Sequence, residues 1–214
     1  MNNIKIAIAK LIVFIYTLFY RILNKALKTV YISRMYSCGR NLTIDCLFSR
    51  YAGLENFTIG NNVNIPHGTT MYSTEANIVI GDNVMFGPNP TIITGDHRIN
   101  VVGISMNRVY EKLPENDKDV IIEDEVWVGA NVTILKGVKI GRGSVIGANS
   151  LVVKSCPPYS VVMGVPSSIK RFRFSVDEII EHEERIYPQE KRYKREYLIK
   201  MRDEYVIKVD NMDK

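Results

Sequence analysis

The chain has 214 residues, 46% of them apolar, and this suffices for a sizeable core; we expect one domain with two appendages. Lys and Arg outnumber Asp and Glu by 28 to 23, but acidic residues interrupt the basic clusters near the C-terminus, so we expect no nucleic-acid partner. Three widely spaced cysteines fit neither a disulfide framework nor a zinc site, and they indicate a reducing, cytoplasmic compartment.

Residues 1–36 are predicted to form an amphipathic N-terminal helix, and no acidic residue precedes Asp45. Only the ten uncharged residues LIVFIYTLFY separate Lys10 from Arg21, whereas a membrane-crossing helix needs about 20. We therefore expect no simple span, and no small-residue cleavage site marks a secretory signal. Three placements stay open: contact with an anionic membrane surface at the inner face, packing against a partner subunit, or burial against the helix's own domain.

An aliphatic residue recurs at every sixth position in the middle of the chain. We call these the hexad residues, and glycine follows three of them, at 129, 141 and 147. Neither a 3.6-residue helix nor a single alternating strand gives this period, which is a signature of a parallel β-helix whose hexad residues stack inward. The small residue beside each allows a tight corner. The series is Ile122, Val128, Ile134, Ile140, Ile146 and Val152.

An earlier block, from Ile59 to Ile92, follows the same rule less regularly, and thirty residues then separate Ile92 from Ile122. We predict an excursion loop at about residues 94–119, which begins with TGDHRIN. Loops that interrupt a rigid repeat commonly carry function, because the scaffold fixes them while their sequence stays free.

Residues 173–214 are predicted to form a helical extension. Ser175 and Glu178 form a capping box, and the helix is expected to stop or kink near Pro188, followed by either a second helix or a frayed tail. His182, in EIIEHEERI, is expected on a solvated helix face.

The motifs VWVGANV and CPPYSVVMGVP, with TGDH upstream, resemble those of the hexapeptide-repeat acyltransferases. Within that superfamily the chain resembles the sugar and capsular-polysaccharide O-acetyltransferases, with the maltose/galactoside and virginiamycin-type enzymes as relatives. The resemblance covers about residues 57–172. It implies an all-β core, a left-handed parallel β-helix over residues 37–172, a homotrimer with active sites between subunits, and acetyl-CoA as co-substrate.

Acetyl transfer to a hydroxyl needs a base, because a free alcohol is a poor nucleophile near neutral pH. The resemblance places that base at the start of the excursion loop, and His97 matches the position. Asp96 is expected to shape the turn rather than to orient His97. His67 lies near the acceptor-binding positions of relatives, and its role stays open. The three histidines, at 67, 97 and 182, are too far apart for a zinc site of this fold, so we expect no metal.

The same resemblance implies a set of coenzyme A contacts. Trp127 matches the tryptophan that lines the pantetheine path, and two alanines eighteen residues apart match small corner positions. Two basic residues match those near the nucleotide phosphates. Val153 departs from the family, where threonine is common. The implied cofactor-binding residues are Trp127, Ala130, Ala148, Lys154 and Arg171.

The sequence therefore predicts an acetyl-CoA-dependent O-acetyltransferase that acts on a saccharide hydroxyl in cell-surface polysaccharide synthesis. A streptogramin-type antibiotic O-acetyltransferase and a non-catalytic β-helix scaffold are the alternatives.

Overall fold

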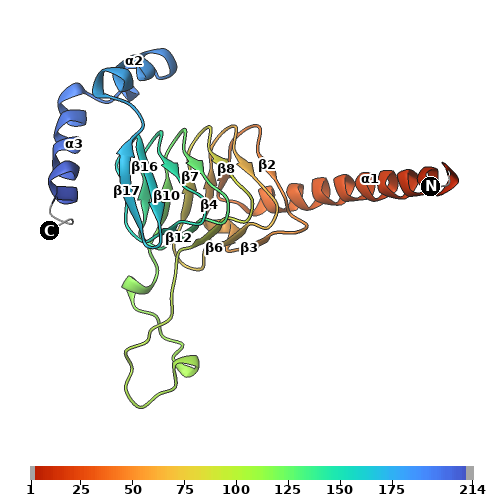
Figure 1. Cartoon of the computed structure of the whole chain (residues 1–214). Helices are drawn as coiled ribbons and strands as arrows, with labels where there is room; N and C mark the ends of the chain where they lie inside the picture. Colours follow the sequence, from red (N-terminus) through yellow and green to blue (C-terminus); the bar gives the residue numbers. More distant parts are fainter. Residues whose placement is uncertain (1–2, 211–214) are drawn as a thin grey trace.

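The computed structural model describes residues 3–210, with side chains to Tyr205. The chain winds as a left-handed parallel β-helix with three flat sides, and helix α1 extends from one end while α2 and α3 lie at the other (Figure 1). The expected fold class, an all-β core with helical extensions at both ends, is confirmed.

Each side of the β-helix is a sheet built from one short strand of every coil. The first sheet contains β1 (Ser37–Cys38), β4 (Phe57–Ile59), β7 (Ile78–Ile80), β10 (Val120–Ile122) and β13 (Lys139–Ile140). The second contains β2 (Thr43–Ile44), β5 (Asn64–Ile65), β8 (Met85–Phe86), β11 (Trp127–Val128), β14 (Val145–Ile146), β16 (Ser160–Gly164) and β17 (Ser167–Phe172). The third contains β3 (Arg50–Ala52), β6 (Thr70–Tyr72), β9 (Thr91–Ile93), β12 (Thr133–Leu135) and β15 (Leu151–Val152).

All neighbouring strands are parallel except β16 and β17, which pair antiparallel at the last edge of the second sheet. The short helix η1 (Leu54–Asn56) lies between β3 and β4. Because coils stack in register, residues one coil apart in sequence lie beside each other, as Ile122 and Ile140 do.

The hexad residues form the core, as the six-residue period predicts. All six are fully buried, with 0% of their surface exposed. Ile80, Ile122 and Ile140 occupy matched positions on β7, β10 and β13, so their side chains form one inward column. Burying a large aliphatic side chain contributes about 1.5–3 kcal/mol, so the columns supply much of the stabilisation of the coils.

Glycine and asparagine have different roles at the corners of the β-helix. A Cβ on Gly129 would lie 2.6 Å from the backbone nitrogen of Ala148, so this glycine is needed for the close approach of the next coil. At many corners an asparagine adopts the left-handed backbone conformation, with φ of 56° at Asn131 and 59° at Asn149. The Asn131 side chain donates to that of Asn149 over 3.1 Å, which ties neighbouring corners together.

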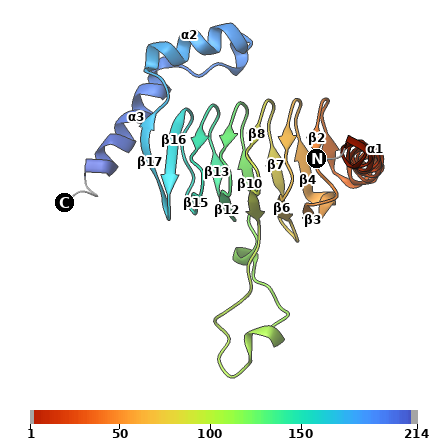
Figure 2. The same cartoon turned by 45° about the vertical axis from the view of Figure 1, so that its right-hand side comes forward.

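Between β9 and β10 the chain leaves the β-helix as a long arm (Figures 1 and 2). The arm carries two short helices, η2 (Met106–Arg108) and η3 (Pro114–Asn116). It interrupts the repeat between the third and first sheets.

Helix α1 (Asn3–Arg34) contains no buried residue. Leu27, Tyr31 and Ile32 nevertheless pack partly against the core of the first coil. By length and apolar composition the helix is sufficient to cross a membrane, which differs from the expectation drawn from the ten residues between Lys10 and Arg21.

The C-terminal extension contains α2 (Val176–Ile186), η4 (Gln189–Lys191) and α3 (Arg195–Asp210). The predicted capping box is present: the Ser175 hydroxyl accepts from the Glu178 backbone nitrogen, and the Glu178 carboxylate accepts from that of Ser175. Of the two alternatives for the rest, the structure shows a second helix. Tyr159, Ile179 and Leu198 are fully buried in a small core of their own, which docks both helices on the end of the β-helix.

Candidate active site

The base of the arm, which we call the stem, brings together residues at both ends of the excursion. The Asp96 backbone nitrogen donates to the Asn116 carbonyl over 2.9 Å, and the Asn116 side-chain amide donates to the Asp96 carboxylate over 2.7 Å. Lys136, on the neighbouring coil, makes a 2.6 Å ion pair with Asp96. These hydrogen bonds, first from Lys136 and then from Asn116, hold the pKa of Asp96 below its ordinary value of 3.8. Asp96 therefore closes the stem. This agrees with the expectation that it shapes the turn rather than orienting His97.

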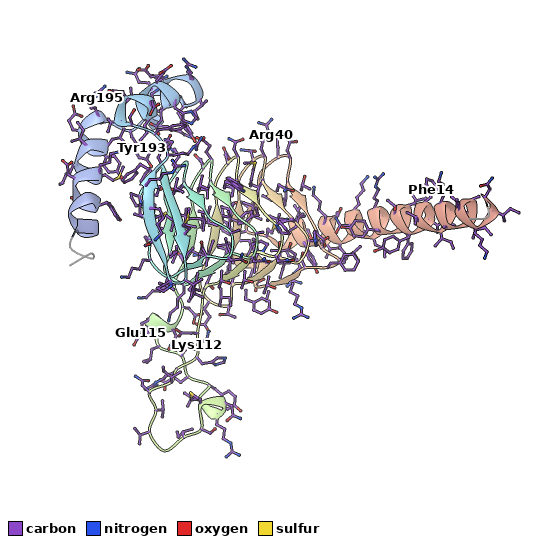
Figure 3. The ribbon with its side chains drawn as sticks, viewed as in Figure 1. Phe14, Arg40, Lys112, Glu115, Tyr193 and Arg195 are labelled. Atoms are coloured by element: carbon purple, nitrogen blue, oxygen red, sulfur yellow. The ribbon has the colours of Figure 1, made fainter. Side chains whose placement is uncertain are left out.

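A second acidic residue closes the other side of the stem. The Asp117 carboxylate accepts from the Thr74 hydroxyl over 2.9 Å and pairs with Lys112 over 2.8 Å. Lys136 also donates to the carbonyls of Glu115 and Asn116. Figure 3 shows Lys112 and Glu115 where the arm joins the β-helix. The stem is thus fixed by charge-assisted hydrogen bonds to the coils, whereas the outer arm projects into solvent.

His97 is the first residue beyond the stem, on the segment by which the chain enters the arm. It is exposed, and no described side chain hydrogen-bonds to its imidazole. Its neighbours Asp96 and Arg98 are both engaged, since Arg98 pairs with Glu111 across the arm over 2.8 Å. The exposed imidazole is therefore flanked by two tethered residues.

Trp127 and Arg171 occupy one row across the outer face of the second sheet. Strand pairing aligns Trp127 with Val145, Val145 with Val161, and Val161 with Arg171. Trp127 is 51% exposed, so its indole lies on the surface as the resemblance implies. An aromatic ring and a guanidinium thus border one continuous strip of sheet.

Ala130 and Ala148 lie on the corner that follows this row. The Asn149 backbone nitrogen donates to the Ala130 carbonyl over 2.8 Å, which places the two alanines on successive coils, as their spacing of eighteen predicts. Because both side chains are small, the corner is open along its length.

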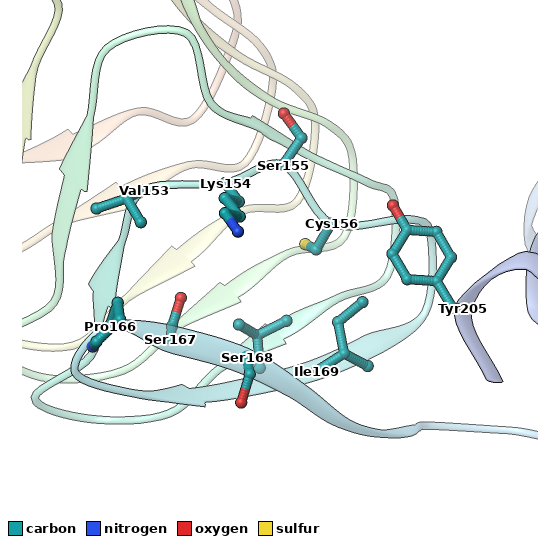
Figure 4. Close-up of a pocket in the computed structure, with 10 residues that line it drawn as sticks. Val153, Lys154, Ser155, Cys156, Pro166, Ser167, Ser168, Ile169 and Tyr205 are labelled. Carbon is teal, nitrogen blue, oxygen red and sulfur yellow. The ribbon is translucent and has the colours of Figure 1, made fainter. Parts of the chain in front are cut away.

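Lys154 lies on a different corner, the one that bears the arm, one coil beyond Lys136. With Val153, Pro166 and Ser167 it lines a cavity of about 540 Å³ between the last coil and β17 (Figure 4). The cavity wall also contains Cys156 and Tyr205, so one end of it is closed by α3.

Within one chain these residues do not converge on a single point. His97 and Lys154 belong to the corner between the third and first sheets, whereas Trp127 and Arg171 lie on the second sheet. The sequence reasoning also missed the stem residues Asn116, Asp117 and Lys136. Their only sequence signal is their position at the return of the loop, and their contacts appear only once the coils are stacked.

The expectation for His182 is wrong. Its Nε2 lies 2.8 Å from the Glu125 carboxylate, which also pairs with Arg173, and its ring packs against Phe174. His182 therefore helps to dock α2 rather than facing solvent. In the described part of the chain, no group of three or more His, Cys, Asp or Glu residues is placed to hold a metal ion.

His67 lies close to the N-terminal helix α1. It lines a second cavity, of about 510 Å³, beside Tyr16, Tyr20 and Asp45, where α1 leaves the first coils. The Tyr20 hydroxyl donates to the Asp45 carboxylate over 2.8 Å.

Residues 119–154 match the family model described as bacterial transferase hexapeptide, with six repeats. They are the coils whose hexad residues fill the core. These residues therefore carry the hexapeptide repeat that the model describes.

Three known proteins are similar to this chain. A galactoside O-acetyltransferase of Lactococcus lactis subsp. lactis is 36% identical over 141 residues, which span 65% of each chain. A probable macrolide acetyltransferase of Lysinibacillus sphaericus is 40% identical over 119 residues, 47% of this chain and 66% of that one. A hexapeptide-repeat acetyltransferase of Vibrio cholerae O1 biovar eltor, complexed with acetyl coenzyme A, is 28% identical with a TM-score of 0.60, over 69% of this chain and 76% of its own. The chain thus spans just under two thirds of the two curated relatives.

Proposed function

We propose that this protein is an acetyl-CoA-dependent O-acetyltransferase that transfers an acetyl group to a hydroxyl of a saccharide. The observation that carries the proposal is the exposed His97, which a tethered stem holds where the long arm leaves the hexapeptide repeat. The similarity to a galactoside O-acetyltransferase supports a sugar acceptor. The similarity to a hexapeptide-repeat acetyltransferase complexed with acetyl coenzyme A supports the donor.

In the proposed reaction, His97 removes the proton of the acceptor hydroxyl as its oxygen attacks the thioester carbonyl. The acetyl carbon passes directly to the acceptor, and the thiolate of coenzyme A leaves as the tetrahedral intermediate collapses. The protonated imidazole then returns its proton to the departing thiolate. Because both substrates are bound together, positioning contributes much of the rate.

The other predicted site residues are proposed to bind coenzyme A. The open corner at Ala130 and Ala148 accommodates a narrow pantetheine arm, and the Trp127 indole provides an apolar wall beside it. Lys154 and Arg171 supply positive charge for the phosphates.

We also propose that the active site forms between copies in a homotrimer. His97 lies on one corner of the β-helix and Trp127 on the opposite sheet, so a single chain does not place the base beside the proposed cofactor strip. A neighbouring copy that lays its arm-bearing corner against this strip completes the site.

A cytoplasmic location in cell-surface polysaccharide synthesis accords with this chemistry. All three cysteines are free. Burial raises the pKa of the Cys46 and Cys156 thiols to about 11, which keeps them unreactive.

The similarity to a probable macrolide acetyltransferase favours a second candidate acceptor, a hydroxyl of an antibiotic. A streptogramin-type drug acceptor belongs to the same class. Both candidates require the same base and donor, so they differ only in the acceptor.

His97→Ala is the decisive variant. We expect release of thiol from acetyl-CoA to fall by about 10²- to 10⁴-fold, because general-base catalysis is lost, and added imidazole to restore part of it. Parallel assays with a galactoside, a macrolide and a streptogramin separate the acceptors. Unchanged turnover in His97→Ala would refute its role. If the unaltered protein releases no thiol from acetyl-CoA with any of these acceptors, the scaffold alternative replaces the proposal.

A further inference from the structure

Helix α1 has two halves with different surroundings. Its C-terminal half contacts the first coil: the Asn24 side chain donates to the Ile44 carbonyl over 2.9 Å and accepts from the Cys46 backbone nitrogen over 2.7 Å. Lys28 donates to the Leu42 carbonyl. The N-terminal half extends beyond the β-helix as a single rod (Figure 1).

The middle of the projecting half is apolar on every side. Residues 11–16 are six consecutive large apolar residues, each between 56% and 64% exposed. Because an α-helix has 3.6 residues per turn, six in succession cover its whole circumference. Residues 11–16 have no polar face of the kind that an amphipathic helix needs to lie flat on a membrane, and the polar residues Lys10, Thr17 and Arg21 flank them on one side of the helix. The six are Leu11, Ile12, Val13, Phe14, Ile15 and Tyr16.

The polar groups of the segment are compatible with hydrocarbon. Thr17 donates its hydroxyl to the Val13 carbonyl over 2.8 Å, so this group is satisfied within the helix. Lys10 is the one charge well inside the apolar stretch. It lies six residues from Ile4, about 9 Å along the helix, and a long lysine side chain can reach back to the interface from that depth.

Length and charge agree with insertion. Residues 4–20 rise about 26 Å, close to the roughly 30 Å of the hydrocarbon core, and Tyr20, whose hydroxyl donates to Asp45, lies at the interface on the side of the β-helix. Basic residues then follow on the side of the β-helix, where they meet the anionic headgroups and, by the positive-inside rule, define the cytoplasmic side. They are Arg21, Lys25, Lys28, Arg34 and Arg40.

We propose that α1 inserts into an anionic lipid bilayer with residues 4–20 in the hydrocarbon and Tyr20 at its edge, so that the β-helix is anchored at the cytoplasmic surface. The inserted helix spans the bilayer rather than lying along it. The cavity between α1 and the first coils, with Asp45 and His67 in its wall, then faces the headgroups. This inference rests on α1 alone and is independent of the acetyltransferase activity.

The test measures partition of the full-length protein into vesicles of phosphatidylcholine with phosphatidylglycerol. Phe14→Asp introduces a charge on the projecting half, far from the β-helix core, and we expect the partition coefficient to fall by about 100-fold. Val102→Asp makes the same kind of change at a residue that is 99% exposed on the arm, and we expect it to leave partition unchanged. Circular dichroism checks that both variants retain the fold.

A salt wash distinguishes insertion from surface attachment. In about 1 M salt the Debye length falls to about 3 Å, so protein held only by charge is released, whereas inserted protein stays with the vesicles. Release by salt, or equal partition of Phe14→Asp and the unaltered protein, would overturn the proposal. It would also be overturned if the protein formed discrete lipid-free oligomers that ignored vesicles and that Phe14→Asp dissociated, because α1 would then pack against other copies.

Discussion

The coils of the β-helix and the arm that interrupts them are stabilised by different kinds of contact. Each coil buries fully enclosed aliphatic columns and repeats its contacts with both neighbours. The arm is held mainly by polar contacts in its stem, and exposed apolar residues such as Ile99, at 76%, contribute no core. The comparison shows that stability and the placement of His97 are controlled by different residues, so substitutions should separate them.

The largest expected effect lies in the coils. Ile134→Ala removes a fully buried side chain from the middle of a column, and we expect the free energy of unfolding to fall by about 2–5 kcal/mol. Ile99→Ala on the arm should change it by no more than about 0.5 kcal/mol. Guanidinium unfolding of both variants measures the difference. Equal losses would show that the arm contributes to the core.

An intermediate effect is expected at the stem. Lys136→Met keeps most of the side-chain length but removes the cation that pairs with Asp96 and donates to the arm carbonyls. We expect about a tenfold loss of turnover, because His97 loses its fixed position. Stability should fall by only about 1 kcal/mol, because Asp96 is half exposed and its ion pair is screened.

Lys139→Met provides the matched control for Lys136→Met. Lys139 pairs with Glu123 over 2.6 Å on the next coil, away from the stem. If both variants lost turnover equally, the loss would reflect general weakening of the coils rather than displacement of His97.

The smallest expected effect is on pH dependence. Because Lys136 and Asn116 lower the pKa of Asp96 in the folded protein, ionised Asp96 stabilises the fold above its unfolded value of 3.8. This contribution disappears as the pH falls through the lower folded pKa. Thermal unfolding from pH 6 down to about pH 3 should therefore show a smaller acid-induced loss for Asp96→Asn than for the unaltered protein. Parallel curves would mean that the stem does not depend on this charge.

The coils were predictable from sequence because their period is local. A six-residue spacing fixes which side chains point inward, and the hexad residues are buried as expected. The asparagine corners were missed, although Asn41, Asn62 and Asn83 recur at intervals of 21 residues. The expectation of a small residue beside each hexad residue does not extend to asparagine, whose short polar side chain tolerates the left-handed conformation.

The stem and the helical ends were less accessible to sequence reasoning. Asp96 and Lys136 are forty residues apart, and only the alignment of β9 with β12 brings them together. His182 was misplaced for a similar reason, because its partner Glu125 belongs to a distant coil. Contacts of this kind follow from the stacking of coils and have no local pattern.

The antiparallel pairing of β17 with β16 has a consequence for assembly. If the last strand of the β-helix were parallel to its neighbour, its free backbone edge could pair with the first coil of another molecule. Repeated pairing of this kind would build an open-ended polymer. Because the chain doubles back there, the edge of the second sheet is formed by β17, which runs antiparallel to the other strands. The first coil of another molecule therefore meets an edge of opposite direction, and the parallel register does not continue along this side.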